Sequence, residues 1–93
     1  MAVEVRIPTI LRKHTGGAKA VEAKGATVRE VLDHLEEQYA GLRASVLTDN
    51  GDIHRFINMY LNDEDIRFLG SLETPVADGD VLSILPAVAG GVW

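Results

Sequence analysis

The sequence predicts one α+β domain in which a single main helix packs on one face of a small mixed sheet. The chain has 93 residues, of which 46% are hydrophobic and 25% charged, a size that supports only one core. Near both ends the apolar residues recur every second position, as in strands, and between these ends they recur at helical spacing. The long connection between the first and last strands permits these two strands to pair in parallel.

The N-terminal segment predicts a β-hairpin. Residues 3–7 alternate between apolar and charged side chains, and Pro8 is expected to end this strand. The two glycines of Thr15-Gly16-Gly17 permit the positive φ angles of a turn, and residues 19–23 are typical of a returning strand.

A helix is expected to begin after Thr27. The Thr27 hydroxyl is placed to accept a hydrogen bond from the Glu30 N–H, and the Glu30 carboxylate to reach back to the Thr27 N–H. Gly41 is expected to cap the other end. Apolar side chains fall on one stripe of this helix, which must cover the sheet: Val28, Val31, Leu32, Leu35 and Tyr39.

The second half of the chain predicts several short elements. In order, they are a helical turn over 42–47, a turn over 49–52, a strand over 56–61, a tight turn over 62–65, a short strand over 66–68, a turn over 78–80 and a last strand over 81–85 stopped by Pro86. Two strands, a helix, a connection and two or three further strands make the order of a β-grasp, ubiquitin-like fold. We therefore expect a β-grasp domain over 1–85 and a flexible C-terminal tail over 86–93.

The uncovered side of the sheet is a candidate docking surface for a protein partner. Alternation places the apolar residues of the strand over 56–61 on both faces, and only one face lies under the helix. An apolar patch on the other face commonly marks a binding site, although each of these residues fits the core equally well. The candidate docking residues are Phe56, Tyr60, Leu82 and Ile84, with Arg55 and Arg67 as further candidates.

Composition excludes several classes of function. The net charge of -5 repels a phosphate backbone, so nucleic-acid binding is not expected. The chain has no apolar run long enough to span a membrane and no secretory signal, so we expect a cytoplasmic protein that does not bind membranes. Because it has no cysteine, thiolate catalysis and disulfides are excluded, and any sulfur chemistry must use sulfur from outside the chain.

No motif of an enzyme or a metal site is present. His14, His34 and His54 are too far apart in sequence for a local metal motif, and the acidic turns do not fit a calcium-binding loop. The nucleophile-elbow, phosphate-loop and dinucleotide-binding glycine motifs are absent. We therefore expect no metal and no catalytic residue.

The C-terminal segment is the most informative part of the chain. Pro86, Ala87, Val88 and Ala89 are expected to form an extended arm that carries Gly90 and Gly91. Glycines lack Cβ atoms, so this pair can pass through a narrow channel and bring a backbone carboxyl to a reactive centre. A frayed chain end explains the diglycine alone equally well.

With the β-grasp pattern, the segments 78–81 and 85–91 resemble those of the MoaD/ThiS family of ubiquitin-like sulfur carriers. Residues 7–12, 15–17 and 54–68 are most similar to the actinobacterial carriers that serve cysteine biosynthesis. The resemblance implies that the chain is a protein cosubstrate and not an enzyme. An activating enzyme of the ubiquitin-activating type would use ATP to adenylate the Gly91 carboxylate, and sulfur would then replace AMP to give a thiocarboxylate.

The resemblance also implies partners. A pyridoxal-phosphate cysteine synthase would accept the sulfur, and a zinc metalloprotease would release the product; the carrier itself would bind no cofactor. Thiamine precursors and thiosugar intermediates are other possible acceptors. The alternatives are the small subunit of molybdopterin synthase, a ubiquitin-like protein modifier joined through Gly91, and a binding module with an inert tail.

The sequence departs from the mature carrier pattern in one respect. Val92 and Trp93 follow Gly91, so a peptide bond blocks the carboxylate that would be adenylated. We expect a protease, such as the zinc metalloprotease, to remove these two residues before activation.

Overall fold

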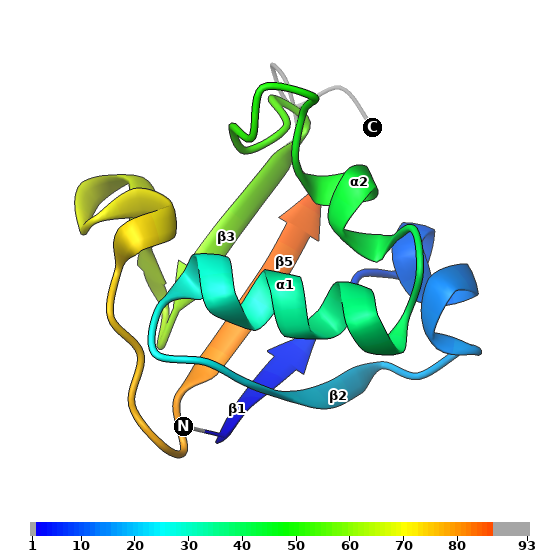
Figure 1. The fold of residues 1–93 in the computed structure, drawn as a ribbon, viewed down its shortest axis with the longest axis horizontal. Helices are drawn as coiled ribbons and strands as arrows, with labels where there is room; N and C mark the ends of the chain where they lie inside the picture. The colour runs from blue at the N-terminus through cyan, green and yellow to red at the C-terminus, as the bar shows by residue number, and fades with distance from the viewer. Residues whose placement is uncertain (1, 87–93) are drawn as a thin grey trace.

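The computed structural model describes residues 2–86, which form a mixed sheet with α1 packed across one face (Figure 1). Figure 1 shows α1 crossing in front of the central strands, with α2 on the same side of the sheet. The elements are β1 (Ala2–Arg6), the 3-10 helix η1 (Thr9–Thr15), β2 (Ala20–Lys24), α1 (Val28–Gln38), α2 (Leu42–Val46), β3 (Ile57–Leu61), β4 (Glu64–Asp65), the 3-10 helices η2 (Ile66–Phe68) and η3 (Ser71–Glu73), and β5 (Val81–Pro86).

The sheet confirms the predicted β-grasp topology. Its strand order is β2-β1-β5-β3-β4. The N-terminal hairpin pairs β1 with β2 antiparallel, and β5 lies between β1 and β3. The first and last strands pair in parallel, with Val5 opposite Leu82, as the long connection between them permits.

The core lies between α1 and the covered face of the sheet. The predicted apolar stripe of α1 is buried at Val28, Val31, Leu32 and Leu35, and Tyr39 packs partly buried against it. The strands contribute every second residue, so β3 buries Ile57, Met59 and Leu61 and leaves Asn58 and Tyr60 half-buried on the other face. None of the described helices is long and apolar enough to cross a membrane.

The start of α1 follows the predicted capping pattern with one difference. The Thr27 hydroxyl accepts a hydrogen bond from the Glu30 N–H at 3.3 Å, as predicted. The Glu30 carboxylate, however, accepts from the Ala26 N–H at 3.0 Å and not from Thr27. Extended pairing of residues 26–28 with 74–76 holds the backbone before the helix, and this backbone brings the Ala26 N–H within reach of Glu30.

Replacing the cap residue tests how much this end of α1 stabilises the domain. We expect Thr27→Ala to lower the free energy of unfolding by about 1 kcal/mol, because a helix N–H loses its acceptor. Urea unfolding followed by circular dichroism measures the change. Thr9→Ala is the matched control, because Thr9 is exposed and its hydroxyl forms no hydrogen bond within residues 2–86; equal losses in the two variants would contradict the assignment.

Three local predictions need correction. Residues 66–68 do not form a strand: Asn62 and Asp63 adopt positive φ angles of 50° and 73°, so the return strand β4 begins at Glu64 and ends after two residues. The Asp65 carboxylate then accepts from the Arg67 N–H at 2.9 Å, which caps η2 instead of extending β4.

The other two corrections concern element ends. Gly41 does not cap α1, which ends at Gln38; with φ of 93°, it starts α2. The last strand includes Pro86, which lies opposite Ile57. Proline is tolerated here because an N–H of residue 86 would point away from β3, and β1 pairs with β5 only as far as Ser83.

Candidate functional site

The C-terminal segment leaves the domain from the middle of the sheet. Pro86 is half-buried at the end of β5, where it lies opposite the first residue of β3. The other predicted tail residues lie outside the described part of the chain: Ala87, Val88, Ala89, Gly90, Gly91, Val92 and Trp93. The two-residue diglycine motif is therefore attached by a short segment to a strand that both neighbouring strands hold in place.

Three residues just before β3 lie beside this exit, and we call them the tail-root cluster: His54, Arg55 and Phe56. The Phe56 side chain is 53% exposed, and its ring centroid lies 5.3 Å from that of His54. The guanidinium carbon of Arg55 lies 5.1 Å from the Phe56 ring centroid, a cation–π distance. Arg55 forms no ion pair with an acidic side chain of residues 2–86.

The four predicted docking residues differ in their exposure to solvent. Phe56 is exposed and Tyr60 is half-buried on the open face of the sheet, where both can meet a partner. Leu82 and Ile84 are 0% and 1% exposed, so their assignment to a docking surface is wrong. They lie opposite Leu61 and Met59 on the helix-covered face, and the open face of β5 carries Ser83 and Leu85.

Arg67 is held on the open face by its neighbours. Its guanidinium donates to the Asn58 amide oxygen at 2.5 Å and to the Asp65 carboxylate at 2.9 Å. The Arg67 side-chain hydrogen bonds to Asp65 lower the pKa of that carboxyl below its usual range. Of the two further docking candidates, Arg67 therefore anchors η2 to the sheet, whereas the Arg55 guanidinium has no acidic partner among residues 2–86.

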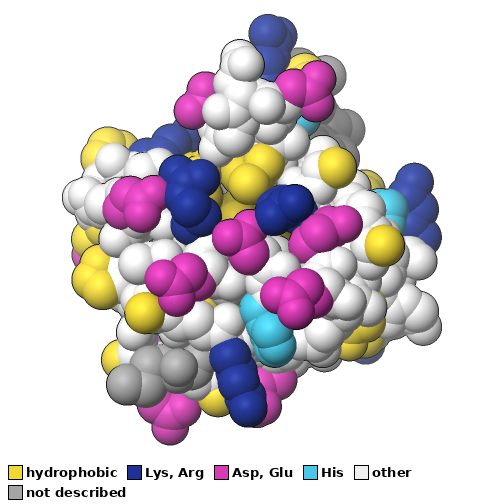
Figure 2. Space-filling model, viewed as in Figure 1, with side chains coloured by type: hydrophobic (Ala, Val, Ile, Leu, Met, Phe, Trp, Pro, Cys, Tyr) yellow, Lys and Arg dark blue, Asp and Glu magenta, His cyan; other side chains and the backbone are white. Residues whose placement is uncertain are grey.

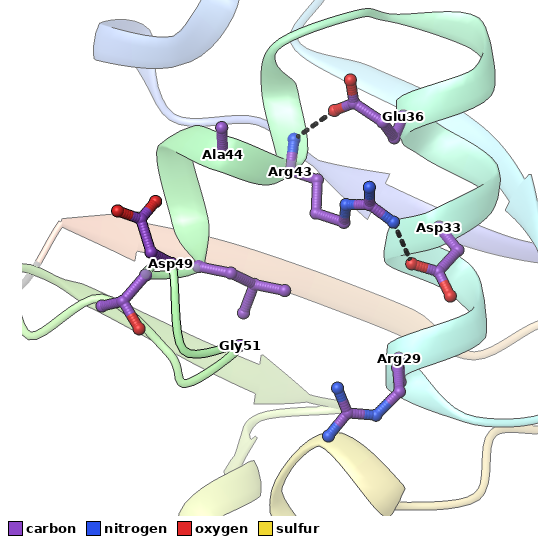
Figure 3. Close-up of a pocket in the computed structure, with 9 residues that line it drawn as sticks. Arg29, Asp33, Glu36, Arg43, Ala44, Asp49 and Gly51 are labelled. Carbon is purple, nitrogen blue, oxygen red and sulfur yellow. Dashed lines mark hydrogen bonds and ion pairs between the residues drawn. The ribbon is translucent and has the colours of Figure 1, made fainter.

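A shallow hollow of about 390 Å³ opens on the helix side of the molecule, which sequence reasoning did not find. Figure 2 shows an apolar floor flanked by basic and acidic side chains. It is lined by Arg29, Asp33, Glu36, Arg43, Ala44, Leu47, Thr48, Asp49 and Gly51, from α1, α2 and the loop after α2 (Figure 3).

Most charged groups of this hollow already have partners, either within the hollow or beside it. Arg43 pairs with Asp33 at 2.5 Å, and Arg29 pairs with Glu73 at 2.6 Å. The Glu36 carboxylate accepts from the N–H groups of Gly41 and Arg43 at 3.0 and 2.9 Å, and these hydrogen bonds lower the pKa of Glu36. The hollow therefore joins α1 to α2, and it does not pair a nucleophile with a base.

The three histidines serve separate local contacts. His14 in η1 lies 3.1 Å from the Ser45 hydroxyl of α2, and His34 of α1 accepts from the Lys24 N–H of β2 at 2.9 Å. His54 belongs to the tail-root cluster. Within residues 2–86, no group of three or more His, Asp or Glu side chains is arranged to hold a metal ion.

The turn before β5 is fixed by Asp80. Its carboxylate accepts from the Ala77 N–H at 2.8 Å and from the Asn62 side-chain amide at 3.0 Å, and these bonds lower its pKa below the ordinary 3.8. Asn62 in turn accepts from the Val81 N–H at 2.9 Å. This network joins the end of β3 to the start of the strand that carries the tail.

The lowered pKa of Asp80 predicts acid sensitivity. Its ionised form contributes stability above pH 3.8, and this contribution is lost as the pH falls through the lower pKa of the folded state. We expect Asp80→Asn to reduce stability at neutral pH and to flatten the loss of stability on acidification. Urea unfolding at neutral and acidic pH measures both effects, with Asp63→Asn as control because the exposed Asp63 carboxylate accepts no hydrogen bond within residues 2–86. An unchanged acid slope in Asp80→Asn would contradict this account.

The mixed sheet, the covering helix and a C-terminal segment that leaves from the central parallel strand define a β-grasp, ubiquitin-like protein. Comparison with protein families matches residues 5–91 to the ThiS family. The chain therefore belongs to the ThiS/MoaD family of sulfur carriers. This confirms the resemblance, and a member of this family is a carrier rather than a catalyst.

Individual relatives agree with this assignment. The chain is 54% identical to the sulfur carrier protein CysO of Mycobacterium tuberculosis, over 98% of this chain and 100% of the relative. It matches a crystal structure of the BexX/CysO complex of Amycolatopsis orientalis with a TM-score of 0.88 and 63% identity, over 96% of this chain and 99% of that one. Small archaeal modifier protein 3 of Haloferax volcanii is 39% identical over 71% of each chain.

The family match ends inside the C-terminal segment. The match includes Gly90 and Gly91 and ends at Gly91, so Val92 and Trp93 lie beyond it. The diglycine thus stands at the last two positions that this chain shares with the family.

Proposed function

We propose that the chain carries sulfur as a thiocarboxylate on Gly91 after Val92 and Trp93 have been removed. The observation that carries this proposal is that the family match ends at Gly91, two residues before the end of the sequence. The 54% identity to the sulfur carrier CysO supports the same chemistry for this chain.

The chemistry requires two steps on a partner enzyme. A carboxylate is a poor electrophile, so the activating enzyme first joins the Gly91 carboxylate to the AMP portion of ATP and releases pyrophosphate. A sulfur nucleophile then forms a bond to the Gly91 carbonyl carbon, and AMP leaves. The carrier binds no cofactor; it supplies the carboxylate and the surface that the activating enzyme recognises.

The carrier contributes position and restraint. β5 pairs with β1 as far as Ser83 and with β3 as far as Pro86, so β3 holds the root of the tail while the glycines enter the partner's active site. Since the chain has no cysteine, it offers no thiol of its own to react with the activated carboxyl. The thiocarboxylate is thus the sole sulfur nucleophile that the carrier presents.

Activation requires prior processing. Gly91 has no free carboxylate while Val92 is joined to it, so adenylation must follow cleavage of the bond between these residues. A zinc metalloprotease that hydrolyses this bond would release the Val92-Trp93 dipeptide and leave Gly91 as the new terminus.

The proposed acceptor is a pyridoxal-phosphate cysteine synthase, because the similarity to CysO covers 98% of the chain. The thiocarboxylate sulfur would add to an aminoacrylate on that enzyme, an S-to-N shift would give a carrier-cysteine amide, and the metalloprotease would release cysteine. The complex of a 63% identical carrier with BexX supports binding of a further protein partner by this chain. Thiosugar or thiamine intermediates are other acceptors that would take sulfur from the same thiocarboxylate.

Labelled sulfur tests the choice of acceptor. The trimmed chain, loaded with isotopically labelled sulfur, is added to an extract of its host with the substrates of cysteine synthesis. We expect the label to appear in cysteine within the first turnover. The control is the trimmed chain with an unmodified carboxylate at Gly91. Label in thiamine or thiosugar products and none in cysteine would contradict the cysteine assignment.

A protein modifier is the second candidate. The similarity to Small archaeal modifier protein 3 favours it, because the same diglycine can form an amide with a lysine amine. The small subunit of molybdopterin synthase is a third possibility, since it would use the same thiocarboxylate. Tandem mass spectrometry after trypsin digestion separates the first two functions. Because Arg67 is the last basic residue of the chain, a modifier leaves residues 68–91 joined to lysines of other proteins, and a carrier leaves none.

A further inference from the structure

β2 is the longer of the two free edges of the sheet. It lies at one end of the strand order β2-β1-β5-β3-β4, and no other described strand pairs with its outer side (Figure 1). The opposite edge, β4, has only two residues before the chain turns into η2, so it offers little backbone for pairing. An unpaired strand edge is a ready template for an extended segment of another protein.

The backbone register shows which groups of β2 point outward. Glu22 lies opposite Glu4 of β1, and the Glu4 N–H donates to the Asp80 carbonyl at 3.0 Å, on the side of β1 that faces β5. Because hydrogen-bonded and non-hydrogen-bonded pairs alternate along an antiparallel ladder, the N–H and C=O of Glu22 point away from β1, and so do those of Ala20. No hydrogen bond joins these four groups to another group of residues 2–86.

The free groups are confined to residues 20–22, which we call the β2 window. After the window, the outward N–H of Lys24 already donates to Nδ1 of His34 at 2.9 Å, so α1 closes the edge there. Before the window, the Lys19 carbonyl points towards β1 and accepts from the Ile7 N–H at 2.8 Å. An added antiparallel strand would therefore pair with the β2 window alone, through its four outward groups.

The β2 window carries an acidic side chain without a cationic partner. The Glu4 carboxylate pairs with Arg6 at 2.9 Å, whereas the Glu22 carboxylate pairs with no cation of residues 2–86. Glu22 and Glu4 lie opposite each other on the open face, where like charges are unfavourable. A shallow hollow of about 250 Å³ lies beside them, lined by Glu4, Ala20, Val21 and Glu22. A basic side chain placed here finds both a carboxylate and room for its stem.

We propose that the β2 window binds an extended segment of a partner protein as an added antiparallel strand, with a lysine or arginine of that segment paired with Glu22. The main chain of the segment bonds to Ala20 and Glu22, and the residue next to the basic one packs on the half-buried Val21. A second copy of this chain is a poor occupant, because pairing two β2 windows places the two Glu22 side chains at neighbouring positions on one face.

This contact leaves the tail free. β1 separates β2 from β5, so the β2 window and the exit of the tail belong to strands about 10 Å apart, at about 4.8 Å for each neighbouring pair. A protein that holds the carrier at the β2 window thus leaves β5 able to present the tail to an active site. The contact needs neither Gly91 nor ATP nor sulfur, so it can be tested apart from the thiocarboxylate chemistry.

A blocked peptide with the sequence Thr-Val-Lys-Val-Thr is the probe, because its alternation places lysine on the open face and valine on the side of Val21. We expect this peptide to shift the amide NMR signals of Ala20 and Glu22 in the full chain most strongly and to slow their exchange with solvent. At about 10 mM peptide, even a contact with a Kd of about 1 mM is about 90% saturated. N-methylation of the peptide lysine should abolish these effects, because it removes an N–H that bonds to β2.

Charge reversal tests the ion pair separately. We expect Glu22→Lys to weaken binding of the lysine peptide about fivefold, because an attractive cross-strand pair becomes a repulsive one. A peptide with glutamate in place of lysine should prefer this variant over the parent protein. Glu64→Lys is the matched control: it changes the net charge equally, and Glu64 is exposed on β4 at the opposite edge of the sheet.

Three results would overturn the proposal. Unchanged Ala20 and Glu22 signals at about 10 mM peptide, a concentration chosen to saturate a millimolar contact, or equal binding of the N-methylated peptide, would show that the edge does not accept a strand. Equal weakening by Glu22→Lys and Glu64→Lys would reduce the contact to an effect of net charge. Ala20 and Glu22 signals that move with the concentration of the chain alone would assign the edge to a second copy.

Discussion

Replacing Gly90 by valine in the trimmed chain will nearly abolish thiocarboxylate formation at Gly91. A glycine has no Cβ, so the last two residues pass where a branched side chain would collide with the walls of a narrow active site. A displacement of the reacting carboxylate by about 1 Å is enough to slow a reaction about 100-fold. The initial rate of thiocarboxylation, followed by intact-protein mass spectrometry with the activating enzyme, ATP and sulfide, measures the effect.

The control for this variant carries the same added bulk nearer the domain. Ala87→Val enlarges a residue next to the root of the tail, where we expect it to change the rate only slightly. Both variants lie outside the described core, so neither should alter the free energy of unfolding. Equal rates for Gly90→Val and the parent chain would contradict the account of the diglycine.

The second large effect concerns the strand that carries the tail. Ile84 is 1% exposed on the covered face of β5, and its neighbour Leu85 is 43% exposed on the open face. We expect Ile84→Ala to lower the free energy of unfolding by about 2–5 kcal/mol, because it removes buried methyl groups and leaves a cavity. Leu85→Ala should cost about 1 kcal/mol or less, since much of that side chain is already in water.

The affinity for the activating enzyme should be reduced more by Leu85→Ala than by Ile84→Ala, the reverse of their effects on stability. Leu85 lies on the open face, so its truncation is expected to weaken docking, whereas Ile84→Ala should bind normally at a temperature where it remains folded. Urea unfolding and titration calorimetry on the two variants measure both quantities. A stability loss of the same size in the two variants would show that the covered and open faces of β5 are assigned wrongly.

Most of the topology could be predicted because it depends on residue periodicity. The stripe from Val28 to Leu35 requires a sheet beneath it, and the distance in sequence between β1 and β5 permits a parallel pair. The Thr27 cap is a local feature of four residues, and the structure confirms its hydroxyl contact. These features need no information about distant parts of the chain.

The wrong predictions concern features that depend on parts of the chain far away in sequence or on backbone angles. Period-two alternation shows that Leu82 and Ile84 share a face, but it does not state which face the helix covers. The polar Ser83 between them is the signal that favours a buried assignment for both. Residues 66–68 read as a strand because the positive φ angles of Asn62 and Asp63, which end the hairpin early, leave no mark on hydrophobic periodicity.

The candidate site was predictable in its chemistry but not in its surroundings. The diglycine and its two-residue extension are visible in the sequence, and the family match ends at the predicted Gly91. The tail-root cluster, in contrast, depends on the pairing of Ile57 with Pro86, two residues 29 positions apart. The hollow between α1 and α2 likewise depends on the contact of Asp33 with Arg43, which no local pattern indicates.

The measurement that tests the central claim most directly is intact and tandem mass spectrometry of the full chain after incubation with a host extract, ATP and a sulfide source. We predict loss of Val92 and Trp93, followed by replacement of one oxygen by sulfur, with the sulfur located on Gly91. A chain that already ends at Gly91 serves as the positive control for the extract. If that control gains sulfur while the full chain keeps both terminal residues and its original mass, or gains sulfur without losing them, the proposal of a processed carrier is wrong.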